Sequence, residues 1–208
     1  MVEDLIKKMT WLGHDCFRIE AEKTIYFDAF EISSGPQADI ILITHDHYDH
    51  CSPDDVAKIQ GPNTVIVTEK DSAKKLSGDV RVVKAGDSID ITGLVVHAVP
   101  SYNIDKDFHP KKNGWLGYII DVEGIKLYHA GDTDFIPEMS DITVDIALLP
   151  VSGTYVMTAD EAVRAALVIK PRVAIPMHYG SIVGDEHDAV RFKTALEGEI
   201  DVVILEKK

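Results

Sequence analysis

The stretch Ile40-Ile41-Leu42-Ile43-Thr44-His45-Asp46-His47-Tyr48-Asp49-His50 joins a short apolar run to a dense cluster of polar side chains. The four residues from Ile40 to Ile43 are branched aliphatics, and such a run indicates a buried strand. Three histidines and two aspartates then follow within six positions, from His45 to His50. The cluster therefore lies where a strand ends, which is the place where layered α/β folds collect their chemistry.

The spacing of the three histidines predicts a metal site. If the chain stays extended through His45 and His47, the period-two geometry of a strand points both rings the same way, as two ligands of one ion. Asp49 and His50, beyond the turn, are then placed for a second ion. Mixed imidazole and carboxylate ligands favour a water-activating site over a closed structural one. The alternative is a solvated loop that is rich in histidine.

The pattern His45-x-His47-x-Asp49-His50 after an apolar strand resembles the hallmark of the metallo-β-lactamase superfamily. The resemblance covers most of the chain, and the most similar branch is the small single-domain one of ascorbate-6-phosphate lactonase-like proteins and metal-dependent hydrolases. It implies an α/β fold with four αββα layers, in which two mixed β-sheets lie face to face with helices outside. It also implies two divalent ions, with zinc as first choice and manganese or iron as alternatives.

Later segments supply the rest of the ligand set that the resemblance implies. Gly131-Asp132-Thr133 resembles the Gly-Asp-Thr motif of the family, which puts Asp132 between the two ions. His178 resembles the last histidine ligand. The expected set is His45, His47 and His109 for one ion and Asp49, His50 and His178 for the other, with Asp132 shared.

His109 enters this set as a substitute. The position just after a strand, where the wider family has a histidine for the first ion, holds Pro100. The long loop from 100 to 114 contains His109, and a loop of that length is usually functional or mobile. We expect His109 to replace the missing ligand, and His97, on the preceding strand, is the alternative.

Other polar residues have weaker signals. Asp28 follows a strand, where the family has an aspartate that supports the metal loop through hydrogen bonds; the alternative is a turn residue that caps local amides. His14 lies in a predicted hairpin turn and either reaches over the site or is solvated. His129 is expected in the core, and His187 is expected in solvent.

The chain of 208 residues with 45% apolar content predicts one domain over residues 1–208. The two cysteines, Cys16 and Cys51, are too few for a disulfide framework. With no apolar centre of a signal peptide near Met1, we expect a cytoplasmic protein. The net charge of −14 disfavours nucleic acid and membrane surfaces as partners.

The expected reaction is hydrolysis of a small ester, a phosphodiester or a lactone, by a hydroxide that bridges the two ions, with Asp49 and Asp132 as the catalytic carboxylates. The substrate is expected to be small, anionic and in some cases phosphorylated. Candidate donors for its anionic group are Tyr102, Asn103, Lys111, Lys112 and Tyr179. Two alternatives remain. One is a di-iron redox protein on the same scaffold, although the redox branch carries glutamate where this chain has His47. The other is a metal-dependent sensor without turnover.

The remaining pattern alternates strands and helices. Capping signals predict helices at 53–60, 68–76, 158–169 and 185–196. Apolar runs predict strands at 9–12, 17–20, 24–27, 40–43, 65–67, 80–83, 88–91, 94–99, 115–121, 125–129, 145–149, 172–176 and 200–205.

Overall fold

The computed structural model describes residues 1–208 and contains two mixed β-sheets packed face to face. The first sheet has its strands in the order in which they occur along the chain: β1 (Met9–Gly13), β2 (Cys16–Glu20), β3 (Thr24–Phe27), β4 (Ala38–Leu42), β5 (Gln60–Thr68) and β6 (Asp79–Val82). The pairs from β1 to β3 are antiparallel, and those from β3 to β6 are parallel.

The second sheet also combines an antiparallel and a parallel part. Its strands are β7 (Ser88–Ile91), β8 (Leu94–Pro100), β9 (Leu116–Val122), β10 (Ile125–His129), β11 (Ile146–Pro150), β12 (Val173–Met177) and β13 (Asp201–Val202). The strands from β7 to β10 pair antiparallel, and those from β10 to β13 pair parallel. Parallel strands that end at one rim bring their following loops together there.

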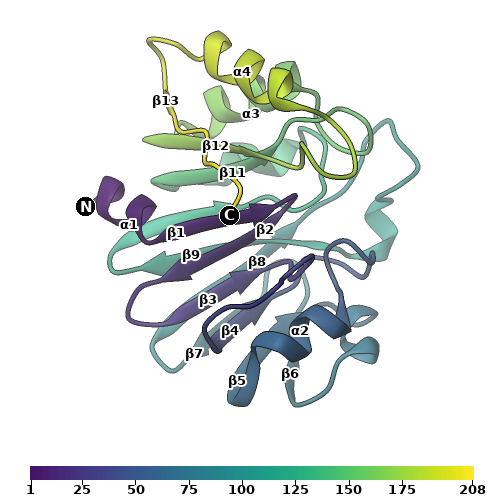
Figure 1. Cartoon of the computed structure of the whole chain (residues 1–208). Helices are drawn as coiled ribbons and strands as arrows, with labels where there is room; N and C mark the ends of the chain where they lie inside the picture. The colour runs from purple at the N-terminus through teal and green to yellow at the C-terminus, as the bar shows by residue number, and fades with distance from the viewer.

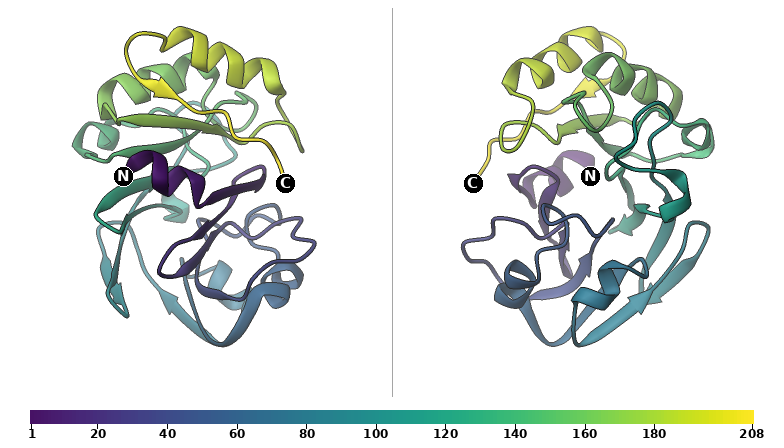
Figure 2. Two further views of the ribbon diagram at one scale, coloured as in Figure 1. Left: turned by 60° about the vertical axis from the view of Figure 1, so that its left-hand side comes forward. Right: turned by 90° about the vertical axis from the view of Figure 1, so that its right-hand side faces the viewer.

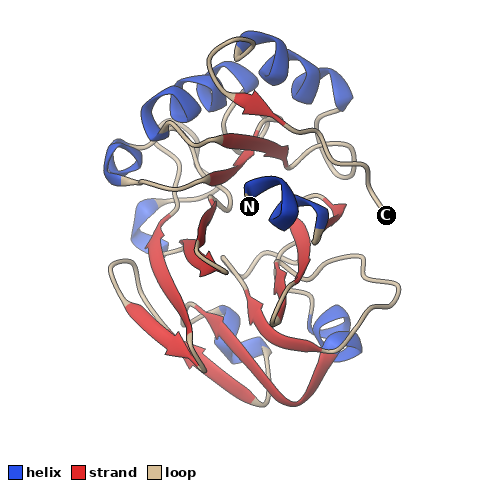
Figure 3. Cartoon of the chain, turned by 90° about the vertical axis from the view of Figure 1, so that its left-hand side faces the viewer, coloured by secondary structure: helices blue, strands red, loops and turns tan.

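Helices cover the outer faces of both sheets. They are α2 (Pro53–Ile59), α3 (Ala159–Ile169) and α4 (Glu186–Ala195). Helix α1 (Val2–Lys7) lies instead beside β1, and the 3₁₀ turns are η1 (Ser72–Lys75), η2 (Lys111–Asn113) and η3 (Pro137–Asp141). Figure 1 shows α3 and α4 together on one outer side and α2 on the opposite one. Figure 3 shows the strands between these helical layers. The expected four-layer αββα arrangement is therefore confirmed.

The alternation of side chains along β4 explains how one strand serves two layers. Ile40 and Leu42 lie in the core between the sheets, whereas Ile41 and Ile43 lie in a second apolar cluster that includes Val56 of α2. An apolar run without polar interruption is what a strand covered on both faces requires. The chain leaves this buried strand directly into the histidine cluster.

Three expectations about elements are corrected by the structure. The helix expected at 68–76 is replaced by the single 3₁₀ turn η1. Strand β5 continues to Thr68, and the Thr68 hydroxyl donates to the Ile43 carbonyl instead of capping a helix. The strand expected at 200–205 is limited to β13. Helix α1 has no counterpart among the expected elements, and it forms because Val2 and Leu5 bury their side chains in the core.

The C-terminal tail connects the two sheets. After β13, the Val203 amide donates to the Ala174 carbonyl beside β12, and the Lys208 amide donates to the Trp11 carbonyl of β1. Figure 2 shows the tail running from the α3 and α4 side toward the first strands. This crossing explains why the predicted long edge strand ends early. No helix of the structure has the length and apolarity needed to cross a membrane.

Candidate metal centre

Side chains with metal-binding atoms converge at the rim where strands of both sheets end. The first sheet contributes His45, His47, Asp49 and His50 from the loop after β4. The second contributes His109 from the loop between β8 and β9, Asp132 after β10 and His178 after β12. The structure therefore brings all seven residues of the expected ligand set to one place.

One group consists of His45, His47 and His109, whose ligand atoms all lie within 4.8 Å of one another. His45 Nε2 and His47 Nδ1 are 3.0 Å apart, a separation that a single ion with metal–nitrogen bonds of about 2.1 Å can span. His109 Nε2 lies 3.1 Å from Asp132 Oδ2. Asp132 thus borders this group, as a shared ligand would.

A second group also contacts the Asp132 carboxylate. His178 Nε2 lies 3.2 Å from Asp132 Oδ2, and His50 Nε2 lies 3.4 Å from Asp132 Oδ1. Asp49 Oδ2 is 3.8 Å from His50 Nε2. Asp132 lies between the two groups because Gly131 (φ 63°) turns the chain sharply after β10.

Outer contacts fix the direction in which three of the rings point. Asp28 accepts hydrogen bonds from His50 Nδ1 at 2.8 Å and from the Thr44 hydroxyl at 2.7 Å. Since that hydroxyl gives its hydrogen to Asp28, it accepts from His45 Nδ1 at 3.0 Å. His109 Nδ1 faces the Asn103 Oδ1 acceptor at 3.0 Å. Each of these rings therefore carries its proton on Nδ1 and turns Nε2 toward the centre.

The outer contact of His178 is of the same kind, because its Nδ1 lies 2.9 Å from the Ser152 hydroxyl. Ser152 had no signal in the sequence, since serine in a loop is ordinary. Asn103 was expected to contact the substrate, and the structure places it instead behind His109. Asp28 supports the metal loop by hydrogen bonds, which is the first of its two expected roles.

His14 lies in the centre of the second group. It is completely buried, its Nε2 is 3.2 Å from Asp49 Oδ2, and its ring centroid is 4.0 Å from that of His178. Its backbone is in the left-handed region at φ 51°, and its carbonyl accepts a hydrogen bond from the His178 amide. Of its two expected states, the structure has the one in which the turn reaches over the site.

Asp15, next in the chain, was not singled out from the sequence. It is completely buried, and neither carboxylate oxygen has a hydrogen-bond partner. Burial, together with the nearby Asp132 carboxylate, raises the pKa of Asp15 well above its usual range. An aspartate in a predicted turn gives no sequence signal of such burial.

Burial and neighbouring charges set the protonation of the cluster. Burial lowers the pKa of His45 well below its usual value and that of His14 to about 4, so both rings are neutral and offer lone pairs. Burial opposes charge on His50 too, yet the carboxylates of Asp132 and Asp28 raise its pKa. Burial would raise the pKa of Asp49, but His14 and His50 hold it at about 2.

The unpaired atoms of the cluster test whether metal ions fit. His50 Nε2, His109 Nε2 and Asp132 Oδ1 are buried and have no hydrogen-bond partner. With Nδ1 of each ring on an outer acceptor, His50 Nε2 and His109 Nε2 face the Asp132 carboxylate at 3.4 and 3.1 Å. Two electron-rich atoms that face each other in a buried site need a cation or a proton between them. The donor set therefore fits divalent ions with nitrogen and oxygen ligands.

Three other histidines lie away from the cluster. His97 is exposed on β8, and its Nδ1 lies 2.6 Å from the Ser88 hydroxyl. His129 is buried and stacks on Phe27 with a centroid distance of 4.8 Å. His187 is 96% exposed. Of the two alternatives for the third ligand, only His109 lies beside His45 and His47.

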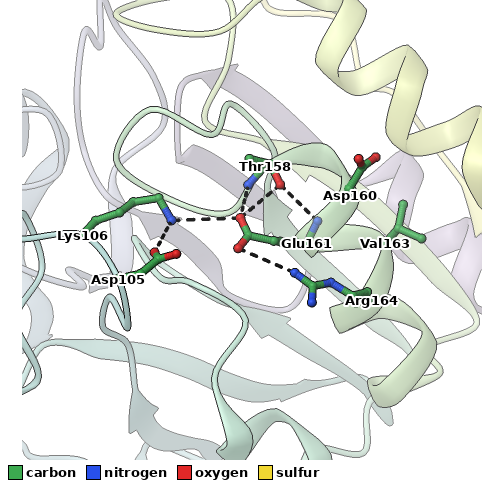
Figure 4. Close-up of a pocket in the computed structure, with 7 residues that line it drawn as sticks. All are labelled: Asp105, Lys106, Thr158, Asp160, Glu161, Val163 and Arg164. Atoms are coloured by element: carbon green, nitrogen blue, oxygen red, sulfur yellow. Dashed lines mark hydrogen bonds and ion pairs between the residues drawn. The ribbon is translucent and has the colours of Figure 1, made fainter.

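A cavity of about 290 Å³ opens over the cluster and is lined by His47, Tyr48, Asp49, Phe108, His109, Asp132, Tyr155 and Ile182. A larger cavity of about 610 Å³ lies between the 101–114 loop and α3. Figure 4 shows that its charged groups pair with one another, for example Lys106 with Asp105 and Glu161 with Arg164. Because it contains no histidine and no unpaired buried group, we assign the chemistry to the smaller cavity.

Comparisons with known proteins agree with this geometry. A family model described as the beta-lactamase superfamily domain matches residues 8–178. A UPF0173 metal-dependent hydrolase from Thermoplasma volcanium is 35% identical over 216 residues, which cover 96% of each chain. A crystal structure of a protein from Parabacteroides distasonis is 35% identical with a TM-score of 0.86, covering 96% of this chain and 93% of that one. A metallo hydrolase from Ignicoccus hospitalis, 24% identical with a TM-score of 0.80 over 96% of this chain and 94% of that one, shows the same fold.

Proposed function

The chain belongs to the metallo-β-lactamase superfamily and is a metal-dependent hydrolase, and we propose that it cleaves a small ester with two divalent ions bound side by side. His45, His47 and His109 would hold one ion, and Asp49, His50 and His178 would hold the other. Asp132 would bridge them. One observation carries the proposal: the ligand atoms His50 Nε2, His109 Nε2 and Asp132 Oδ1 are buried side by side, and none of them has a hydrogen-bond partner.

Two ions bound there would supply a water of lowered pKa as nucleophile, as a hydroxide that bridges them, and would polarise the oxygen of the substrate under attack. Zinc is the first choice for this ligand set, and manganese or iron also suits it. Ester hydrolysis of this kind applies to a phosphodiester or to a lactone.

The residues of the chain keep this arrangement in place. Asp28 and Thr44 orient His50 and His45 through the hydrogen bonds described above, and Asn103 orients His109. Asp132 is buried, and the charges of His178 and His50 hold its pKa well below the usual range although burial opposes this. It therefore stays ionised as a bridging ligand.

Asp49 is the candidate for proton transfer. Its side chain is 15% exposed, and it lines the cavity over the cluster. It can therefore reach both the nucleophilic water and the leaving group of a bound substrate. His14, 3.2 Å away, fixes the Asp49 carboxylate from the other side and acts as a positioning residue.

Elemental analysis and turnover measurements test the proposal together. After loading with zinc or manganese, each chain is expected to hold two ions and to hydrolyse at least one of a phosphodiester, a lactone and a thioester. Chelated protein is the matched control and is expected to be inactive. One ion or fewer per loaded chain would exclude the dinuclear arrangement. Two bound ions without turnover of any ester would instead indicate a sensor or a redox centre.

A further inference from the structure

The cavity over the metal centre has two kinds of lining. Its floor is polar and consists of His47, Asp49, His109 and Asp132. Its walls are the large side chains of Tyr48, Phe108, Tyr155 and Ile182. At about 290 Å³, the cavity lies at the lower end of the range of small-molecule sites, roughly 300–1,000 Å³.

The walls bring exposed apolar side chains together from separate segments. Tyr48 is 67% exposed in the loop after β4, Phe108 is 53% exposed in the 101–114 loop, and Ile182 is 38% exposed in the loop after β12. Single exposed apolar residues are ordinary, but their convergence around a concave site marks a place for a ligand. The walls therefore form an apolar binding surface directly above the reacting groups.

Aromatic contacts hold three of these wall side chains, Tyr48, Phe108 and Tyr155, in place. The Phe108 ring meets the Tyr155 ring edge-on, with centroids 4.5 Å apart and planes at 73°. Tyr48 meets Phe30 at 5.9 Å and 80°. Edge-to-face pairs of this kind are favourable beyond the area that they bury. The rings thus have preferred positions before a ligand binds.

No lysine or arginine lines this cavity. Two lysines of the 101–114 loop are engaged elsewhere: Lys106 pairs with Asp134 at 2.6 Å, and Lys111 pairs with Glu138 at 2.8 Å. Lys112 lines a different cavity, beside Glu69 and Lys70. The Tyr102 hydroxyl donates to Glu138. The donors expected for a substrate phosphate are therefore absent from the walls.

A phosphate on the far part of a substrate would be unfavourable here. Its charge would lie against the apolar walls, beyond the ion-binding floor, where no lysine or arginine side chain pairs with it. The charged side chains that do line the cavity are Asp49 and Asp132, both acidic. An aromatic or branched alkyl group would instead bury its surface against Tyr48, Phe108 and Ile182.

We propose, on the basis of the hydrolase function proposed above, that the substrate is an uncharged carboxylic ester or lactone with an aromatic or branched alkyl substituent. That substituent binds between Tyr48, Phe108, Tyr155 and Ile182. In the reaction, water adds to the carbonyl carbon, and the bond from this carbon to the ester oxygen breaks. The proton that the water loses passes to the leaving oxygen, so that an ester gives a carboxylic acid and an alcohol and a lactone gives a single hydroxycarboxylic acid.

A set of matched lactones tests the proposal on the metal-replete full chain. The set consists of γ-butyrolactones that differ only in the substituent at the γ-carbon: phenyl, butyl, hydroxymethyl or phosphoryloxymethyl. We expect kcat/KM for the phenyl compound to exceed that for the hydroxymethyl compound by about tenfold or more, from apolar area buried. The phosphoryloxymethyl compound is expected to be the poorest. Equal or faster turnover of the phosphoryloxymethyl compound would overturn the inference.

Variants of the walls give an independent readout. Phe108→Ala and Tyr48→Ala should each lower the phenyl-to-hydroxymethyl ratio of kcat/KM by about threefold to tenfold, because each removes apolar contact area. Ile182→Lys should raise turnover of the phosphoryloxymethyl compound relative to the other three. Leu167→Ala on α3, 40% exposed and away from the cavity, is the matched control and should leave every ratio unchanged. Unchanged ratios in all three wall variants would contradict the proposal.

Two further measurements separate this inference from the hydrolase proposal. If bis(4-nitrophenyl) phosphate is cleaved faster than 4-nitrophenyl hexanoate, the hydrolase proposal stands and the inference fails. If no ester is cleaved, the hydrolase proposal fails, and calorimetric binding of two non-hydrolysable ketones then decides the inference. Tighter binding of 3-phenylcyclopentanone than of 3-(phosphoryloxymethyl)cyclopentanone, by about tenfold, supports the apolar cavity. Equal binding, or tighter binding of the phosphorylated ketone, overturns it.

Discussion

The imidazole of His109 illustrates how single residues define this site. Its Nδ1 faces the Asn103 and Tyr155 oxygen acceptors at 3.0 and 3.2 Å, and its Nε2 lies 3.1 Å from the Asp132 carboxylate. Both sides of the ring are thus specified by neighbours. His97 has one hydrogen bond, to Ser88, and is exposed. The two histidines that the sequence left as alternatives therefore predict different effects of mutation.

His109→Ala is expected to remove one of the two bound ions and to lower kcat/KM by at least about 100-fold. Loss of an outer partner of a metal ligand already costs 10–100-fold, and loss of the ligand itself should cost more. Elemental analysis and turnover on the preferred ester measure both effects. His97→Ala is the control and should keep two ions and near-normal turnover. Loss of an ion and of turnover in His97→Ala, with both retained in His109→Ala, would assign the third ligand to His97.

Asp28→Ala is expected to lower the free energy of unfolding by about 3 kcal/mol or more, because it leaves three buried donors, two of Thr44 and one of His50, unpaired at about 1–3 kcal/mol each. Metal affinity should fall by about 10–100-fold as the His50 ring loses its orienting acceptor. Denaturant titration of the metal-free and metal-loaded protein separates the two effects. Asp54→Asn, exposed on α2, should change stability by less than about 0.5 kcal/mol. An equally small change in the free energy of unfolding of Asp28→Ala would contradict the role of Asp28 in holding Thr44 and His50.

At the scale of the elements, local signals predicted most strands and three helices. The apolar run of β4 and the Thr158 and Ser52 caps are patterns that neighbouring residues alone determine. The Thr68 prediction was wrong because its hydroxyl bonds to the carbonyl of Ile43, the residue that follows β4. A threonine followed by polar residues has the same local sequence whether its hydroxyl caps a helix or bonds to a distant carbonyl. Local pattern cannot reveal which partner tertiary structure will supply.

In the candidate site, too, some features follow from the local sequence and others only from the tertiary structure. The cluster from His45 to His50 is contiguous, so the sequence alone indicated it. The burial of His14 depends on the hydrogen bond from the His178 amide to the His14 carbonyl, which joins the two sheets. The apolar walls come from loops that are distant in sequence, at Tyr48, Phe108 and Ile182. Their convergence is a property of the fold and has no local pattern.

The N-terminus of α3 offers a test of a local signal. The Thr158 hydroxyl accepts from the Glu161 amide, and the Glu161 carboxylate accepts from the Thr158 amide, so the cap is reciprocal. Thr158→Ala should lower the free energy of unfolding by about 1 kcal/mol. Urea denaturation measures this, with Thr143→Ala, exposed and outside any helix, as the control. Equal effects of the two substitutions would show that the cap is without influence.

At the scale of the whole molecule, the metal centre joins two halves. The first sheet carries the ligands from His45 to His50, and the second carries His109, Asp132 and His178. Hydrogen bonds also connect the halves at this rim, from the His178 amide to the His14 carbonyl and from the Leu116 amide to the Thr44 carbonyl. Ions bound between them would therefore stabilise the packing of one sheet on the other.

Removal of the ions should then destabilise the entire fold. A ligand present at 100 times its dissociation constant stabilises the folded state by about 2.7 kcal/mol. In a chain of this length, each kcal/mol shifts Tm by about 2–4 °C, so each ion should contribute about 5–10 °C. Chelation with EDTA should lower Tm by that amount for each ion lost, and added zinc should restore it. EDTA already saturated with zinc is the control and should have no effect. If elemental analysis shows that both ions are gone and Tm is unchanged, the ions do not stabilise the packing of one sheet on the other. Protons alone would then compensate the Asp132 carboxylate and the histidine nitrogens that face it.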